Sequence, residues 1–397
     1  MEAVVSDVLE SRARRGVPGW LLALWRLAVG IWKYALGVVL TMNPFGAVMV
    51  VGWTARAMQR TAFKAWWGQT ERPYKKMMSF REAAAHHPGW VGQATWPNWI
   101  LSQDIGRDLR RGRIHRLAAG LWTNFRLGVL LLVNTYLVLG LPCLLMATWW
   151  YAGWQISFNK AYEYFSFGAS VSLLAIVLFA IGMFYVPMAQ ARQAIAGEWR
   201  AFWQFSLVRR VIRRRWFCCL LLALAYVVTG VFVMILLALP MAPEFQDWFN
   251  DLPREKLDLT IRGYYLLGAI YIFPAYLGLR WAAARVYASA IAHMLATGEV
   301  RPDELSSAER LAFPPERINA PAVAAEWTRR DTLRSWTLSA PFRLTCGAIA
   351  LAAWLVFVSE IYFSQFFVYR GPRVWMSHPL VQLPWTDYSP ATRAEPR

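Results

Sequence analysis

Three polar side chains interrupt long apolar runs, and they are the residues of this sequence that could support chemistry. Glu360 stands inside the last apolar run, Asn134 lies among leucines and valines, and Arg280 lies near the end of another run. A charged group at membrane depth is costly, and a polar group there needs a hydrogen-bonding partner. We therefore treat these three residues as the candidate functional polar residues of the predicted membrane spans.

Each of the three also has a purely structural explanation. If Glu360 lies deep in the membrane, it would titrate in a proton-coupled site. If it lies at the outer interface, it would pair with Arg370 or Arg373. Asn134 would line a polar pathway, or it hydrogen-bonds to a neighbouring helix. Arg280 would contact a substrate, or its side chain extends along the helix to the lipid headgroups. The sequence favours the structural explanation in each case.

No familiar catalytic or metal-binding pattern accompanies these residues. The sequence contains no G-x-S-x-G, H-E-x-x-H, Walker A or G-x-G-x-x-G motif, and its 4 cysteines form no C-x-x-C or Cys/His cluster. Glu360 has no second carboxylate beside it in its apolar run. We therefore predict no catalytic residue, no metal ligand and no cofactor, and we expect a protein that is not an enzyme.

Long apolar runs separated by charged segments indicate a membrane protein. Apolar residues make up 57% of the sequence and charged residues 17%, whereas soluble domains carry about 25% charged residues. Because about 20 apolar residues cross the hydrocarbon core as a helix, we expect an all-α, polytopic helical bundle with about six spans and amphipathic helices at the interface. The predicted parts are an N-terminal tail and interfacial helix at 1–34, a first span at 35–53 that is kinked or broken at Pro44, a basic cytoplasmic membrane-surface segment at 54–126, two transmembrane hairpins at 127–283, a cytoplasmic linker at 284–343, a last span at 344–368 and an external tail at 369–397.

Positive charge is concentrated in the segments between the predicted hairpins. Residues 54–126 contain 13 Lys and Arg against 4 acids, and residues 189–215 contain 7 against 1, whereas residues 241–262 contain 3 against 5. Basic residues stay on the cytoplasmic side and attract anionic lipid headgroups. We therefore expect a multi-pass protein of the bacterial inner membrane, with its C-terminal tail outside. The predicted basic membrane-surface residues are Arg107, Arg110, Arg111, Arg113, Arg209, Arg210, Arg213, Arg214 and Arg215.

The net charge of +18 could also suggest a nucleic-acid partner. The charge is divided among several segments, however, and does not form one basic face. The expected partner is therefore a lipid bilayer with anionic headgroups and not a nucleic acid. Association with a second copy of the chain or with another membrane protein stays open.

A short pattern occurs at the ends of both predicted returning helices. In each of the segments 191–198 and 284–299, Ala-Arg is followed by Gly-Glu. The spacing between the two dipeptides differs, so the pattern is compatible with a duplicated helical hairpin or with chance.

The sequence resembles a family of polytopic bacterial integral membrane proteins that is known only as a domain of unknown function. The resemblance rests on Gly-Trp-Thr-Ala-Arg at 52–56, Trp-Pro-Asn-Trp at 96–99 and the segment 187–202. It covers roughly residues 35–300 and implies the membrane topology alone, because the family has no assigned activity.

Three function classes are left after these considerations. Few polar residues lie inside the spans, which favours a non-enzymatic scaffold, assembly factor or regulator. The break at Pro44, the possible duplication and Glu360 favour a transporter or permease. A lipid-modifying enzyme is a third alternative, which rests on basic residues at headgroup depth. A closed apolar bundle would support the scaffold, and a polar cavity at mid-membrane would support the transporter.

Overall fold

The computed structural model describes residues 19–67, 113–149, 165–238 and 252–312, together with short pieces between 344 and 352. The regular secondary structure of these residues is entirely helical, which confirms the predicted all-α class. The helices are α2 (Gly19–Thr41), α3 (Pro44–Trp67), α7 (Arg113–Trp149), α9 (Phe165–Ala196), η3 (Trp199–Trp203), α10 (Phe205–Arg214), α11 (Trp216–Ala238), α13 (Arg254–Ala296), η5 (Pro302–Glu304) and α14 (Ser307–Ala312).

Three segments of the described residues are long and apolar enough to cross a membrane. They are Ala118–Leu145 in α7, Leu173–Ala196 in α9 and Leu259–Ala296 in α13. Leu27–Thr41 in α2 and Trp216–Gly230 in α11 are shorter apolar segments. These helices support a membrane location, while the predicted count of six spans is not confirmed.

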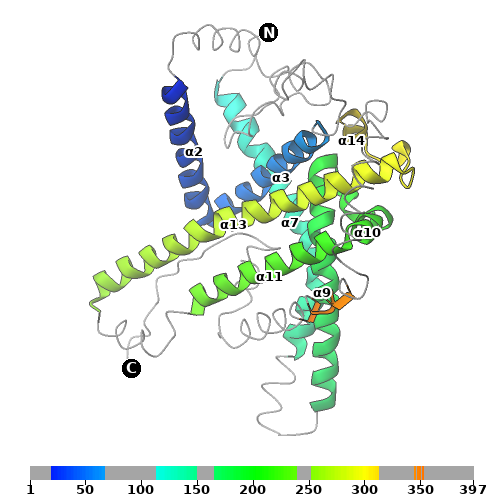
Figure 1. The fold of residues 1–397 in the computed structure, drawn as a ribbon. Coiled ribbons are helices and arrows are strands. Elements are labelled where there is room, and N and C mark those ends of the chain that lie inside the picture. Colours follow the sequence, from blue (N-terminus) through cyan, green and yellow to red (C-terminus); the bar gives the residue numbers. More distant parts are fainter. Residues whose placement is uncertain are drawn as a thin grey trace.

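The helices form two pairs that meet at one end. α7 runs beside α9, α11 runs beside α13, and the two pairs diverge from the region where α9 and α13 end (Figure 1). α3 packs against α7, α9 and α13, whereas α2 contacts α3 and α13 and otherwise stands apart (Figure 1). The short α10 and α14 lie at the same end as the C-terminal turns of α13 (Figure 1).

A helix boundary lies at the predicted break. The side-chain oxygen of Asn43 accepts a hydrogen bond from the backbone N–H of Gly46 at 2.6 Å, and Pro44 is the first residue of α3. This is a favourable helix start, because the asparagine satisfies a free N–H and proline has none to lose. The predicted first span at 35–53 is therefore divided between α2 and α3.

Residues 54–67, which were expected at the membrane surface, continue α3 and pack into the core. Met58, Phe63 and Trp66 are each 1% exposed, and the indole N–H of Trp66 donates to the carbonyl oxygen of Ala288 at 2.9 Å. Apolar residues gather on one side of this helix. A charge count over the whole segment 54–126 does not reveal such a face, and for this reason the burial of residues 54–67 was not predicted.

α3 and α7 approach each other at two glycines. A Cβ on Gly52 would collide with the backbone carbonyl of Asn124, and a Cβ on Gly128 would collide with that of Val48. Small residues spaced four apart commonly allow helix backbones to come this close in membranes. The Gly52 of the motif at 52–56 therefore has a packing role.

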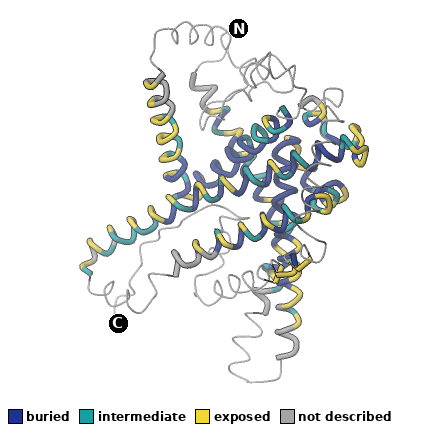
Figure 2. Tube along the Cα trace, in the orientation of Figure 1, coloured by how far each residue is buried: buried dark blue, intermediate teal, exposed yellow. Residues whose placement is uncertain are grey.

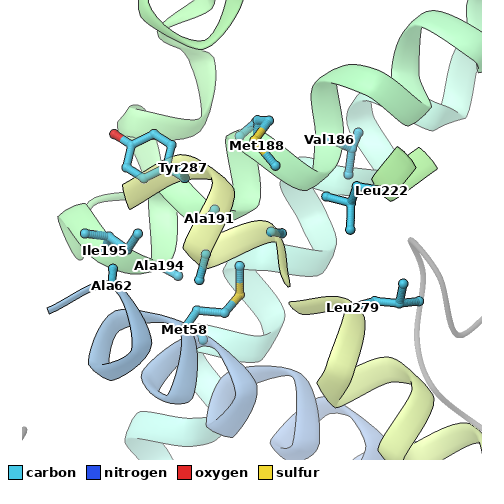
Figure 3. Packing of buried hydrophobic residues seen from close by; sticks show 14 of the residues in the cluster. Met58, Ala62, Val186, Met188, Ala191, Ala194, Ile195, Leu222, Leu279 and Tyr287 are labelled. Atoms are coloured by element: carbon cyan, nitrogen blue, oxygen red, sulfur yellow. The ribbon is translucent and has the colours of Figure 1, made fainter. Parts of the chain in front are cut away.

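The core lies where the ends of α9 and α13 meet α3 (Figure 2). Every residue from 185 to 196 is buried, so α9 continues for two turns beyond the point where the sequence predicted an inner loop. In Figure 3, Ala62 of α3 lies beside Ile195 of α9, and Met58 of α3 lies on the side of Ala194. Both α9 and α13 stop at a glycine with positive φ, Gly197 (72°) and Gly298 (74°), as helices often do.

Candidate functional site

A buried ion pair joins three helices at the meeting point of α9 and α13. Arg192 of α9 and Glu309 of α14 are both 0% exposed, and their charged groups lie 3.3 Å apart. The hydroxyl of Tyr287 in α13 accepts a hydrogen bond from Arg192 at 2.7 Å and donates one to Glu309 at 2.7 Å. We call Arg192, Tyr287 and Glu309 the buried triad.

Neighbouring groups complete the hydrogen bonding of the triad. The Arg192 guanidinium also donates to the side-chain oxygen of Gln204 and to the carbonyl oxygen of Glu304, at 2.9 and 3.3 Å. Glu309 accepts from the backbone N–H of Ser306 at 3.0 Å, and the Ser306 hydroxyl accepts from the N–H of Glu309 at 3.2 Å. This is a capping box, so one carboxylate both starts α14 and neutralises Arg192.

A second, more exposed set of contacts fastens α10 to the end of α13. Arg210 forms an ion pair with Glu304 and donates to the carbonyl oxygen of Glu299 at 2.8 Å. Arg214 lies 3.6 Å from the Glu299 carboxylate and contacts the ring of His293. The hydrogen bond from Arg210 lowers the pKa of Glu304, so this carboxylate keeps its charge in mildly acidic solution.

The arginines predicted at the membrane surface do not behave alike. Arg209, Arg213 and Arg214 are exposed, and Arg210 is half-buried in its pair with Glu304. Arg215 is buried, with 9% exposure, and donates to the hydroxyl of Ser289 at 3.2 Å. The prediction that Arg215 lies at the membrane surface is therefore wrong. The chain turns from α10 into α11 at this residue, and its side chain lies against α13.

Asn134 forms bonds between helices. Its amide donates to the side-chain oxygen of Gln193 at 3.0 Å and to the carbonyl oxygen of Trp199 at 3.1 Å. Its own oxygen accepts from the indole of Trp203 at 3.1 Å. These bonds join α7 to α9 and η3, which is the arrangement that the structural explanation of Asn134 requires. These three hydrogen bonds connect Asn134 to other protein groups and do not point to a polar transport pathway.

Arg280 is a buried arginine of α13. It is 3% exposed in α13, and its guanidinium lies 4.7 Å from the centre of the Tyr276 ring. No carboxylate of the described ranges forms an ion pair with it. A cation–π contact contributes about 0.5–2 kcal/mol, whereas removing a charge from water costs several kcal/mol even after relaxation. The burial of Arg280 therefore contradicts the expectation that its side chain extends to the headgroups. The phenol groups of Tyr226 and Tyr276 are its hydrogen-bonding neighbours.

The other predicted candidates lie outside the described residues. These are Glu360 with its proposed partners Arg370 and Arg373, and the basic residues Arg107, Arg110 and Arg111; for Arg113, the backbone but not the side chain is described. Within the described ranges, no three His, Cys, Asp or Glu side chains gather where a metal ion could be held.

The buried triad itself was missed by the sequence interpretation. Part of it has a local signal, because Ser306-Ser307-Ala308-Glu309 fits the capping-box pattern. The partner of Glu309 is 117 residues away along the chain, and no local pattern connects the two. Chemically, the triad has all its charges and hydroxyls engaged within the protein, which suits a fixed joint between helices.

Comparisons with known proteins give no relative for this arrangement. No family model matches the sequence, and neither a curated protein nor a solved structure is similar to it. The resemblance to a bacterial membrane family therefore stays a prediction.

Proposed function

We propose that this chain is a non-enzymatic, multi-pass membrane protein that acts as a scaffold, assembly factor or regulator. The observation that carries the proposal is the buried triad, together with the fully buried end of α9 around it. A joint of this kind holds α9, α13 and α14 in one arrangement. We call the joined ends of α9 and α13, with α10 and α14, the platform.

Exposed apolar side chains support the membrane part of this proposal. Away from the platform, the helices carry large apolar residues on their outer faces. Contact of these side chains with water would be unfavourable, whereas contact with lipid tails would not. Examples are Leu137 and Leu144 in α7, Leu173 and Ile181 in α9, Phe232 in α11 and Leu267 in α13. We place these faces in the bilayer of a bacterial inner membrane, and we keep the six-span topology with an external C-terminal tail as part of the proposal.

The platform suits the cytoplasmic surface of such a membrane. Arg209 and Arg213 of α10 are exposed, while Leu207 and Val211 on the opposite face of the same helix are buried. Trp199 is also exposed and stacks under the guanidinium of Arg200. Exposed tryptophan beside arginine is the composition that meets lipid headgroups at an interface. Anionic lipid is therefore the partner that we propose for this face.

A transporter is the second candidate, and Arg280 is the observation that favours it. A charged residue buried inside an apolar helix pair is by default a candidate for an ion or substrate pathway. Transport by alternating access would require the two helix pairs to rock against each other. The triad opposes this motion, because it ties the ends of both pairs together.

A distance measurement between spin labels distinguishes the two functions. Labels would be attached at Ser206 and Ser307, exposed residues of α10 and α14, in a chain whose 4 native cysteines are replaced. We expect one narrow distance distribution in lipid nanodiscs, because the platform is a fixed joint. The Glu309→Gln variant should broaden the distribution. Two well-separated distances in the otherwise unchanged chain would contradict the scaffold and favour the transporter.

A further inference from the structure

We propose that the described part of the chain contains two copies of one unit, and that these copies bind each other through a symmetric interface at the platform. The first unit consists of α7, α9, η3 and α10, and the second consists of α11, α13, η5 and α14. Each unit is a helical hairpin that is followed by a 3-10 turn and a short helix. The inference goes beyond the scaffold function and does not depend on it.

The first argument is a sequence pattern that occurs twice with the same spacing. Residues 197–209 and residues 298–310 both read Gly-Glu-x-Arg-x-x-x-x-x-Ser-x-x-Arg, in which x is any residue. Five of the 13 positions are therefore identical. The spacing differed when the Ala-Arg dipeptides were compared, because those dipeptides are not at equivalent positions. The two segments match when they are aligned at Gly197 and Gly298.

The second argument is that the backbone follows the same course through both segments. Gly197 ends α9 with a φ of 72°, and Gly298 ends α13 with a φ of 74°. A 3-10 helix follows each glycine, and the two 3-10 helices end at equivalent residues, Trp203 and Glu304. A short α-helix comes next in each unit. A glycine at the end of a helix is common by itself, whereas two unrelated helix ends would not share this order of elements in one register.

The third argument is that each unit holds the long helix of the other. Arg192 and His293 are at equivalent positions, because each lies five residues before the glycine of its unit. Arg192 pairs with Glu309 in the short helix of the second unit, and His293 contacts Arg214 in the short helix of the first. α14 therefore packs on α9, and α10 packs on α13. Reciprocal contacts of this kind define an isologous interface, in which both partners use the same surface.

The arrangement of the long helices fits a two-fold relation between the units. α9 and α13 both end at the platform, and the two helix pairs diverge from it (Figure 1). A two-fold axis through the platform would exchange the two pairs. In the proposed topology both hairpins enter the membrane in the same direction, so this axis would stand perpendicular to the bilayer. Repeats related in this way are one of the known arrangements of duplicated membrane proteins.

The two halves of the interface share their shape but differ in chemistry. Val208 of α10 is the equivalent of Glu309 in α14, and both are buried. Ser206 and Ser307, at the repeated serine of the pattern, are both exposed. Because valine replaces the carboxylate in the first unit and histidine replaces Arg192 in the second, the buried ion pair occurs in one half of the interface.

Distances between spin labels test the two-fold relation. A two-fold axis makes the distance between two positions in different units equal to the distance of the exchanged pair. Labelled cysteines would replace Arg200 and Arg310 in one full-length chain, and Arg209 and Arg301 in another, all of them exposed and in chains without native cysteines. We expect the two distance distributions to share one maximum in lipid nanodiscs. Two different maxima would overturn the symmetric interface.

The matched control measures distances within each unit. Arg200→Cys with Arg209→Cys reports the shape of the first unit, and Arg301→Cys with Arg310→Cys reports that of the second. These two distributions should also share a maximum, and different maxima would overturn the common unit. Each labelled chain is required to keep the Tm of the unlabelled chain. The width of a distribution reports whether the platform is fixed, as the scaffold requires, whereas agreement between maxima reports the symmetry, so the two proposals can fail separately.

Discussion

Glu309→Gln is expected to lower the free energy of unfolding by about 3–5 kcal/mol, the usual cost of leaving one member of a buried ion pair without its partner. Arg192 and Glu309 are both 0% exposed, so water cannot replace the lost charge. Glutamine keeps the shape of the side chain and can still serve in the capping box with Ser306. The lower free energy of unfolding would therefore be due to the lost charge of Glu309 and not to a weakened start of α14. Denaturant unfolding of the full chain in detergent measures it.

The matched control is Glu304→Gln in the neighbouring pair with Arg210. Both side chains of that pair are 34% exposed, and exposed pairs contribute about 0–1 kcal/mol. A double variant, Arg192→Met with Glu309→Leu, should recover most of the stability, because well-packed apolar groups often replace a buried ion pair at little cost. If Glu309→Gln and Glu304→Gln had equal, small effects, the triad would not be the joint of the platform.

Gly52→Ala is expected to cost about 3 kcal/mol or more, at the upper end of the range for overpacking. The added Cβ would meet the backbone carbonyl of Asn124, and a backbone cannot move aside as a side chain can. α3 and α7 would have to separate along their length. The loss would appear in the same unfolding measurement and as a lower yield of folded protein.

Gly140→Ala is the control for this change. Gly140 lies in α7, the helix that Gly52 of α3 contacts, and a Cβ at Gly140 meets nothing within 4 Å. Alanine favours a helix over glycine by up to about 1 kcal/mol, so this variant should be unchanged or slightly more stable. Equal tolerance of Gly52→Ala and Gly140→Ala would show that the two helix backbones are not in contact at Gly52.

The structural features that were predicted correctly depend on residues close to one another in the sequence. The long apolar runs gave the helical class, and Asn43-Pro44 marked a helix boundary because capping acts within one turn. Counting charges gave a basic segment at 189–215, and within it Arg209 and Arg213 are exposed. These features need no knowledge of distant contacts.

Features that depend on distant contacts were not predictable in the same way. Gln190 and Arg192 look like the end of a membrane helix, yet both are buried. Gln190 hydrogen-bonds to Thr135 of α7, and Arg192 contacts α13 and α14. Arg215 differs from Arg213 in burial and not in type, so a run of arginines cannot reveal which of them turns inward. Arg280 looked like a residue that could reach the headgroups, and only its packing beside Tyr276 shows otherwise.

The most direct test of the proposed architecture is the side of the membrane on which each end of a helix lies. Single cysteines would replace Ser206 in α10 and Lys256 in α13, both exposed residues, in the chain without its native cysteines. A membrane-impermeant maleimide would then be applied to intact cells and to inside-out vesicles. We predict that the Ser206→Cys chain reacts only in the vesicles and that the Lys256→Cys chain reacts only in the cells, since in the proposed topology α11 crosses the bilayer between the two positions. Reaction of both positions from the same side would contradict the proposal that α11 spans the membrane.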